Sequence, residues 1–548
     1  MSAYWHIFIL LTVFVWHSAW LPSAWSTTSV LNKRPDAIID LMTEEGVQLV
    51  KGQWRYQDTS LVEVTHPGPG VDLGPSGPPI RTFDVLPHAG VKEFDDSSWQ
   101  PIPAPGLETR RATGKLCFNW YRINLTMPER IGTFNTAGST AVFEIVIDDY
   151  AEVWVDGKLP LVLGQSGDHL IQGFNAPNRV VLSRHVQPGQ TIQLAVFGVN
   201  GPLSNPPGNF IWVRSATLDF YQAFRIEQNK EFVGNVVRKD PALDAIVSPE
   251  TKLEKLASGF SFTEGPVWVP KTDKTDGYLL FSDPNDNTIY RMTAEGTVSV
   301  FRVKSGYSGF NIGEYHQAGS NGLALDHQGR LTINQHGNRR IIRVEPHGNI
   351  TVLADRYEGK RLNSPNDLVY RSDGSLYFTD PPFGLPNAFT DSRKELPYSG
   401  VFRWHEGRLQ LVANDLRGPN GLAFSPDETY LYVDNWDPEK KIIMRYDVQP
   451  DGTLSNGQVF FDMTHATGED ALDGLKVDQQ GNVYATGPGG LWILSPEGKH
   501  LGTIQGPENP HNMAWGDDDR QTLYITAESG IYRIRLNTSG AASKKDPT

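Results

Sequence analysis

Apolar and polar residues alternate in short stretches through the second half of the chain, and the pattern recurs six times. In each repeat a polar or acidic residue precedes an apolar strand, which is followed by a turn and a second strand. Successive repeats begin about 50 residues apart, and an all-β repeat of that length is typical of a propeller with one four-stranded blade per repeat. The repeats begin at Glu264, Asn321, Asn366, Asn420, Asp473 and Asn512.

Equivalent positions of successive blades lie at the same distance from a propeller axis, so these six residues are expected to meet at the central channel. The last repeat has no outer strand after Ile534, whereas the segment 253–259 reads like the outer strands of the other repeats. We therefore predict a six-bladed propeller over 251–536, closed by pairing between 253–259 and the last blade. Such pairing removes an exposed sheet edge.

The first half of the chain also reads as strands separated by turns, with clear alternation in 140–147 and 191–199. This pattern indicates a β-sandwich over 46–222. Residues 223–250 are charged and lack a strong period, which predicts a linker, and 537–548 are expected to form a flexible tail. The predicted fold class is therefore all-β, with an N-terminal sandwich followed by a propeller.

An apolar run at 7–16 is too short to span a bilayer. Small residues around Ser23 follow it, which is typical of a signal peptide over 1–26, although no Lys or Arg precedes the run. We expect export to the periplasm or the extracellular space, and membrane anchoring if the leader is not cleaved. The net charge of −14 argues against a nucleic-acid partner, and the single cysteine, Cys117, excludes an intrachain disulfide.

Two carboxylates and four amides are thus expected at the channel. A buried carboxylate is costly unless it is paired or bound to a metal, and no Lys or Arg is found at positions that match Glu264 or Asp473. Carboxylate and amide oxygens select Ca²⁺-like or Mg²⁺-like ions over soft metals. Alternatively, these side chains only cap the starts of strands through hydrogen bonds to the backbone.

Five motifs follow one another in the second half: TEGPVW at 263–268, NSPNDL at 363–368, FTDPPFG at 378–384, GPNGLAFSPD at 418–427 and LDGLKVD at 472–478. Together they closely resemble the SMP-30/gluconolactonase (regucalcin-like) family, and the resemblance covers about 250–536. It implies a six-bladed propeller with one divalent metal ion in the channel, and hydrolysis of a sugar lactone.

The resemblance also implies the site. The metal ligands of the family fall on Glu264, Asn420 and Asp473, and Asn366 is bound directly or through water. Ca²⁺ is the expected ion, with Mg²⁺, Mn²⁺ and Zn²⁺ as alternatives. Animal members carry an arginine two residues before the amide that corresponds to Asn366. This chain has Ser364 at that position, so the sugar contacts of the animal members are not carried over.

Three further residues are candidates for substrate binding. His336, in QHGNRR at 335–340, resembles bacterial members of the family. It is interpreted as a substrate contact or proton shuttle, or alternatively as a hydrogen-bonded histidine of the channel wall. Asn321 and Asn512 complete the ring and are expected to contact substrate hydroxyls. Asp367 and Asp380 are expected to brace loops.

The mechanism follows from this ligand set. A metal ion acts as a Lewis acid on the lactone carbonyl, and Asp473 is the predicted catalytic residue because it can take a proton from water. The chain has no Gly-x-Ser-x-Gly elbow, so a serine-hydrolase route is not supported. The alternatives are hydrolysis of non-sugar lactones or organophosphates, and a non-enzymatic, metal-stabilised protein that binds glycans.

The first domain carries a resemblance of its own. The segments EFDDSSW at 93–99, WYR at 120–122 and VWVDGK at 153–158 resemble the sugar-binding, galactose-binding-like jelly roll of family 2 glycoside hydrolases. That resemblance implies an accessory module that contacts carbohydrate. Alternatively, Trp99 and Trp120 are core residues. No glycosidase barrel follows, so no catalytic carboxylate pair is assigned.

Overall fold

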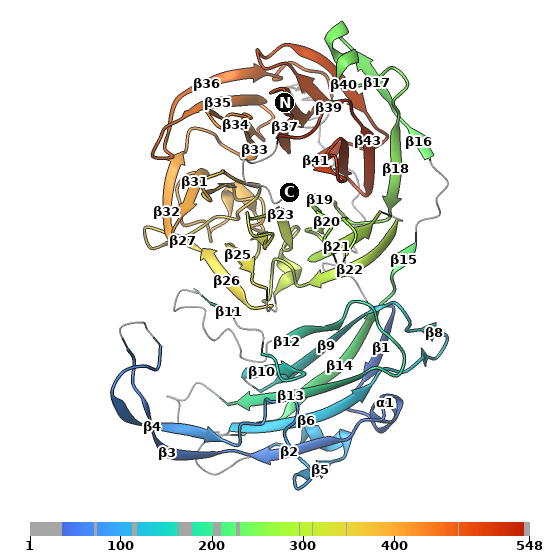
Figure 1. Ribbon diagram of the computed structural model, residues 1–548, viewed down its shortest axis with the longest axis vertical. Coiled ribbons are helices and arrows are strands. Elements are labelled where there is room, and N and C mark those ends of the chain that lie inside the picture. The colour runs from blue at the N-terminus through green and yellow to red at the C-terminus, as the bar shows by residue number, and fades with distance from the viewer. Residues whose placement is uncertain are drawn as a thin grey trace, which may run out of the picture.

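Two β-rich bodies follow one another along the chain in the computed structural model, a sandwich of two sheets and a ring of six sheets (Figure 1). The all-β prediction is confirmed. Among the described residues, no helix is long and apolar enough to cross a membrane. The expected leader and Cys117 lie outside the described residues. The structure describes 35–541 except 71–73, 112–117, 149, 160–161, 164–177, 201–209, 226–230, 274, 295, 310, 347 and 469–470.

The ring is a propeller of six antiparallel blades, numbered here from one to six in chain order. Each of the six repeat starts lies in an innermost strand or two residues before it, which confirms the predicted order of blades. The innermost strands are β19 (Glu264–Val269), β23 (Ser320–Leu325), β29 (Leu368–Tyr370), β33 (Pro419–Phe424), β37 (Leu475–Val477) and β41 (Pro510–Gly516).

The remaining strands of the blades follow outward from the axis, because each one pairs with the strand before it in the chain. They are β20 (Tyr278–Asp283), β21 (Thr288–Thr293) and β22 (Thr297–Val303) in blade one, β24 (Leu331–Gln335), β25 (Arg340–Val344) and β26 (Ile350–Ala354) in blade two, β30 (Leu376–Asp380), β31 (Gly400–His405) and β32 (Arg408–Ala413) in blade three, β34 (Tyr430–Asn435), β35 (Ile442–Val448) and β36 (Leu454–Asp462) in blade four, β38 (Val483–Gly487), β39 (Gly490–Leu494) and β40 (His500–Gln505) in blade five, and β42 (Thr522–Ala527) and β43 (Gly530–Arg535) in blade six.

Blade six is completed by a strand from the other end of the propeller. β18 (Leu253–Ser258) pairs antiparallel with β43, with Ala257 opposite Ile531. The Arg533 guanidinium donates to Glu254 Oε2 at 2.9 Å across this pair. The ring is therefore closed as predicted, by a strand that precedes blade one in the sequence.

The segment 223–250 is more than a linker. Three short strands in it extend the outer edges of blades one, six and five: β15 (Phe224–Arg225), β16 (Glu231–Val233) and β17 (Asn235–Arg238). The short helix η3 (Pro241–Ala245) follows. These additions are physically reasonable because the outermost strand of a blade still has backbone groups without partners.

The start of the predicted tail is also ordered against the propeller. The backbone N–H of Asn537 donates to Ile246 O at 2.9 Å, and that of Ala541 donates to Val477 O at 3.0 Å. Thr538 is buried. The expectation of a flexible tail is therefore wrong for 537–541, because these backbone groups find partners at Ile246, just after η3, and at Val477 of blade five.

The first domain packs two sheets face to face over an apolar core that includes Trp54, Phe143, Leu194 and Leu218. It begins at β1, nine residues before the predicted boundary, and a short helix, α1 (Glu44–Leu49), follows that strand. One sheet has the order β1 (Ala37–Asp40), β14 (Val213–Tyr221), β9 (Thr140–Ile147) and β12 (Asn178–Ser183), and the other β10 (Tyr150–Val155), β13 (Thr191–Val199), β6 (Phe118–Thr126), β2 (Trp54–Asp58) and β5 (Gln100–Ile102).

Trp99 and Trp120 lie in a small cluster of their own with Phe94, Trp154 and Phe197. Both tryptophans are buried, which agrees with the core interpretation of these two residues. The resemblance to a sugar-binding jelly roll stays a prediction. A two-stranded hairpin, β3 (Ser60–Pro67) and β4 (Pro79–Leu86), runs along the far side of this domain from the propeller (Figure 1).

The sandwich is anchored to the outer part of blades one and two (Figure 1). Val142 and Tyr221 of the sandwich share a buried cluster with Phe281 of blade one, and Thr140 Oγ1 donates to Val300 O at 3.0 Å. A further strand, β11 (Val162–Leu163), pairs in parallel with β26 at the edge of blade two. The two domains therefore share a core and are not separated by solvent at this contact.

Candidate active site

The six repeat starts lie in or beside the innermost strands of the blades, around the propeller axis. Glu264, Asn321, Asn366, Asn420 and Asn512 are all at most 4% exposed, whereas Asp473 is half-buried. Side chains from different blades contact one another directly. Asn366 Nδ2 of blade three donates to Asn420 Oδ1 of blade four, and Asn512 Nδ2 of blade six donates to Glu264 Oε2 of blade one at 3.1 Å.

A glycine follows four of the six residues, and it has a packing role. A Cβ atom on Gly265, Gly322 or Gly421 would lie 1.9, 2.5 or 2.6 Å from the main-chain oxygen of the residue that starts the next blade's inner strand. Gly421 N donates to Asp473 O at 2.7 Å across one of these contacts. The glycines therefore let neighbouring inner strands approach closely at the axis. This explains the Asn-Gly and Asp-Gly pairs better than turn formation does.

Glu264 has one oxygen in use and one without a partner. Its Oε2 accepts hydrogen bonds from Gly265 N and from Asn512 Nδ2. Its Oε1 is buried and has no hydrogen-bond partner. Burial, with the neighbouring charge of Asp367, raises the pKa of Glu264 to about 7. A buried oxygen without a donor is costly, and a cation would remove that cost.

His336 lies behind Asn366, and burial lowers its pKa to about 4. Its Nε2 is 3.0 Å from Asn366 Oδ1, and its Nδ1 is 3.3 Å from Gln317 O. The ring is fully buried. This geometry favours the channel-wall interpretation, in which a neutral histidine orients the Asn366 amide.

The two remaining amides differ from each other. Asn321 Oδ1 is buried and has no hydrogen-bond partner, so it stays a candidate for contact with substrate or metal. Asn512 uses both polar atoms within the protein. Its Oδ1 accepts from Met513 N at 2.8 Å and from Lys476 Nζ at 3.2 Å, while its Nδ2 donates to Glu264 and Asp367. Its geometry is that of a residue that orients carboxylates.

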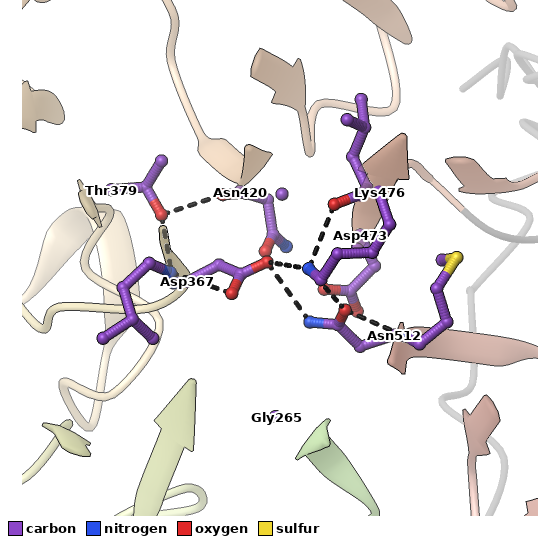
Figure 2. A network of polar contacts seen from close by, with 12 residues as sticks. Gly265, Asp367, Thr379, Asn420, Asp473, Lys476 and Asn512 are labelled. Atoms are coloured by element: carbon purple, nitrogen blue, oxygen red, sulfur yellow. Dashed lines mark hydrogen bonds and ion pairs between the residues drawn. The ribbon is translucent and has the colours of Figure 1, made fainter. Parts of the chain in front are cut away.

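Sequence reasoning missed an ion pair inside the channel. Lys476 Nζ lies 3.3 Å from Asp367 Oδ2, and Figure 2 shows both beside Asn512 and Asp473. Asp367, expected to brace a loop, therefore faces the site. The sequence did contain a signal for this pair, because Lys476 is a polar residue between Leu475 and Val477 on an innermost strand. Side chains alternate along a strand, so Lys476 points to the opposite side from these two buried neighbours.

The oxygens present fit a hard divalent cation. Among the described residues, no group of three or more His, Cys, Asp or Glu side chains could hold a metal ion. The candidate shell is instead mixed, with carboxylates from Glu264 and Asp473 and amides from Asn366 and Asn420. Glu264 Oε1 and Asn321 Oδ1 are buried without partners. Oxygen donors of this kind suit Ca²⁺ and similar ions.

Comparison with known proteins places the second domain in a family. Residues 262–529 match the model described as "SMP-30/Gluconolactonase/LRE-like region". A gluconolactonase of Zymomonas mobilis is 38% identical over 327 residues, which are 58% of this chain and 91% of that protein. A 6-deoxy-6-sulfogluconolactonase of Pseudomonas putida is 34% identical over 155 residues, 25% of this chain and 52% of that protein.

A solved structure is similar over a comparable share of the chain. The gluconolactonase of Xanthomonas campestris is 31% identical, and the match covers 57% of this chain and 100% of that one, with a TM-score of 0.49. The sequence match to the Zymomonas protein is long enough to decide the family. The chain belongs to the SMP-30/gluconolactonase family.

Proposed function

We propose that the propeller channel hydrolyses a sugar lactone with the help of one divalent cation, Ca²⁺ in the first instance. Glu264, Asn420 and Asp473 would hold the ion, together with Asn366. One observation carries the proposal: Glu264 Oε1 is buried at the channel without a hydrogen-bond partner. Relatives named as gluconolactonases support the substrate class.

When bound, the ion would polarise the lactone carbonyl and stabilise the negative charge that develops on its oxygen. Asp473 is more exposed than the other candidate ligands, so it is the carboxylate placed to take a proton from the attacking water. Water adds to the carbonyl carbon, the ring ester bond breaks, and the product is a hydroxy acid.

The other side chains orient and bind. His336 holds Asn366 by one hydrogen bond, and Asn366 in turn donates to Asn420, so the two amides cannot rotate independently. The side-chain oxygen of Asn420, Oδ1, accepts this one hydrogen bond and has a second lone pair available for a ligand. Asn321 Oδ1, which has no partner, would accept a hydrogen bond from a substrate hydroxyl.

A panel of lactones tests the proposal. Wild type and Asp473→Ala are assayed on sugar lactones, non-sugar lactones and an organophosphate, with Ca²⁺ and with EDTA. Asp518→Ala is the matched control, because Asp518 is exposed in the turn after β41. We expect hydrolysis of sugar lactones that EDTA and Asp473→Ala both abolish and Asp518→Ala does not.

Two other outcomes are informative. Activity that survives both EDTA and Asp473→Ala would overturn the mechanism. Ca²⁺ binding without hydrolysis of any lactone would favour a non-enzymatic, glycan-binding protein, and turnover of the organophosphate alone would change the substrate class.

The accessory role of the sandwich belongs to the same proposal and rests on the motif resemblance at 93–99. The full chain is run in native gels cast with different polysaccharides, where binding retards migration. Equal mobility in every gel would contradict a carbohydrate-binding role. Export is likewise proposed, and an intact residue 1 on the mature protein would contradict cleavage of the leader.

A further inference from the structure

The ammonium group of Lys476 lies in a cage of three oxygens (Figure 2). Its Nζ is 3.0 Å from Leu475 O, 3.2 Å from Asn512 Oδ1 and 3.3 Å from Asp367 Oδ2. The side chain of Lys476 is 23% exposed and that of Asp367 is 5% exposed. The pair therefore lies largely out of water, inside the channel that also holds Glu264.

The three oxygens are a main-chain carbonyl, an amide and a carboxylate. This is the mixture that protein sites use for hard cations such as Ca²⁺. Lysine is a compact point charge with three donors and no preferred plane. It can therefore occupy an oxygen cage much as a small cation does, with the difference that it is covalently tethered to β37.

The channel also contains a carboxyl group that this lysine does not pair with. Asp434, on β34, is fully buried, and its Oδ2 has no hydrogen-bond partner. Burial raises the pKa of Asp434 well above its usual range, and the charges of Asp367 and Glu264 raise it further while that of Lys476 lowers it. Asp434 is therefore within electrostatic reach of Asp367, Glu264 and Lys476.

We propose that Lys476 is a positioning residue that takes the place of a second hard cation in the channel. Its ammonium neutralises Asp367 and supplies one of the two hydrogen bonds that Asn512 Oδ1 accepts. That amide then donates to Glu264 Oε2 and leaves Glu264 Oε1 unpartnered. The inference rests on the proposed function in one respect, since the oriented carboxylate belongs to the proposed metal shell.

The proposal makes a statement about stoichiometry. With the tethered charge present, the channel needs one divalent ion. Without it, Asp367 Oδ2 and Asn512 Oδ1 each lose one of their two hydrogen-bond donors, and a mobile cation can take its place. Removal of the lysine should therefore raise the number of bound ions, whereas a purely structural lysine would only lower stability when removed.

The experiment is calorimetric titration of Ca²⁺ into the chelator-treated full chain. Wild type is compared with Lys476→Gln, Lys476→Arg and the double variant Lys476→Gln/Asp367→Asn. Lys499→Gln is the control, because Lys499 is 65% exposed and pairs with Asp240 from the turn between β39 and β40, the outer strands of blade five. Thermal unfolding with and without Ca²⁺ is recorded for each protein.

We expect one Ca²⁺ per chain for wild type, Lys476→Arg, Lys499→Gln and the double variant, and two for Lys476→Gln. The thermal stabilisation by Ca²⁺ should be largest for Lys476→Gln. A single ion bound by Lys476→Gln with wild-type affinity would overturn the proposal.

Two further outcomes keep the proposals separate. If wild type binds no Ca²⁺ and Lys476→Gln binds one, the proposed catalytic ion fails and the tethered cation stands. If Lys476→Gln does not fold, the double variant decides. It removes both charges and should bind as many ions as wild type, and an additional ion bound by it would refute the role given to Asp367.

Discussion

Ring closure by β18 can be tested with one substitution, Leu253→Ala. Leu253 is 5% exposed and belongs to the buried cluster that contains Tyr532 and Ile534 of β43. Truncation of a buried leucine to alanine costs about 2–5 kcal/mol. If the propeller unfolds as one unit, each kcal/mol lowers Tm by about 2–4 °C for a domain of this size class. We therefore expect a fall of roughly 4–20 °C.

The size of the fall in Tm alone does not distinguish loss of ring closure from general damage to the core. Hydrogen exchange of the backbone amides distinguishes them, because it reports local opening for each segment separately. Loosening of β18 should raise exchange in Gly530–Arg535 of β43, which is far away in sequence, and leave Leu454–Asp462 of blade four unchanged.

Val459→Ala is the matched control, because Val459 is 51% exposed on β36. A surface change of this kind alters stability by less than about 0.5 kcal/mol. Exchange in β43 that stays at the wild-type level in Leu253→Ala, despite a lower Tm, would refute the role of β18 as the closing strand.

The remaining predictions concern the axis and the buried acids. Ca²⁺ at 100 times its Kd should stabilise wild type by about 2.7 kcal/mol, and Asp473→Ala should lose most of this shift in a thermal scan; an undiminished shift would remove Asp473 from the metal shell. Gly421→Ala should cost about 1–3 kcal/mol through overpacking and reduce lactone hydrolysis, because its Cβ would lie 2.6 Å from Asp473 O, whereas Gly313→Ala, with no atom near its Cβ, should do neither. Burial raises the pKa of Asp380 to about 7. Its stabilising contribution is therefore complete below about pH 4 and is lost as the pH rises through 7, at most about 4 kcal/mol. The Tm of Asp380→Asn should therefore rise relative to that of wild type as the pH increases from 5 to 9. Parallel curves of Tm against pH for the two proteins would contradict this.

The repeat in the sequence was enough to predict the six blades, their order and the strand that closes the ring. It succeeded because alternation and repeat length depend only on local pattern, and the six repeat starts occupy equivalent positions. The acids Glu264 and Asp473 stood out because they break the run of amides.

The contacts between blades could not be predicted in the same way. The Lys476–Asp367 pair joins blades three and five, and no local pattern reports which residues face each other across a channel. The edge strands in 223–250 are only two to four residues long, and their pairing depends on outer strands far away in sequence. The glycines beside the channel residues suggested turns, because their close contact with the next blade is tertiary.

The position of β18 has a consequence for synthesis. β18 leaves the ribosome more than 250 residues before β43, its partner in blade six. The sandwich, with its own core, has by then been completed and can fold first, since domains generally fold as units from the N-terminus. All six blades must then emerge before the ring can close, and pairing between strands so far apart in sequence is slow. The nascent chain therefore carries an unpaired sheet edge until its last blade is made.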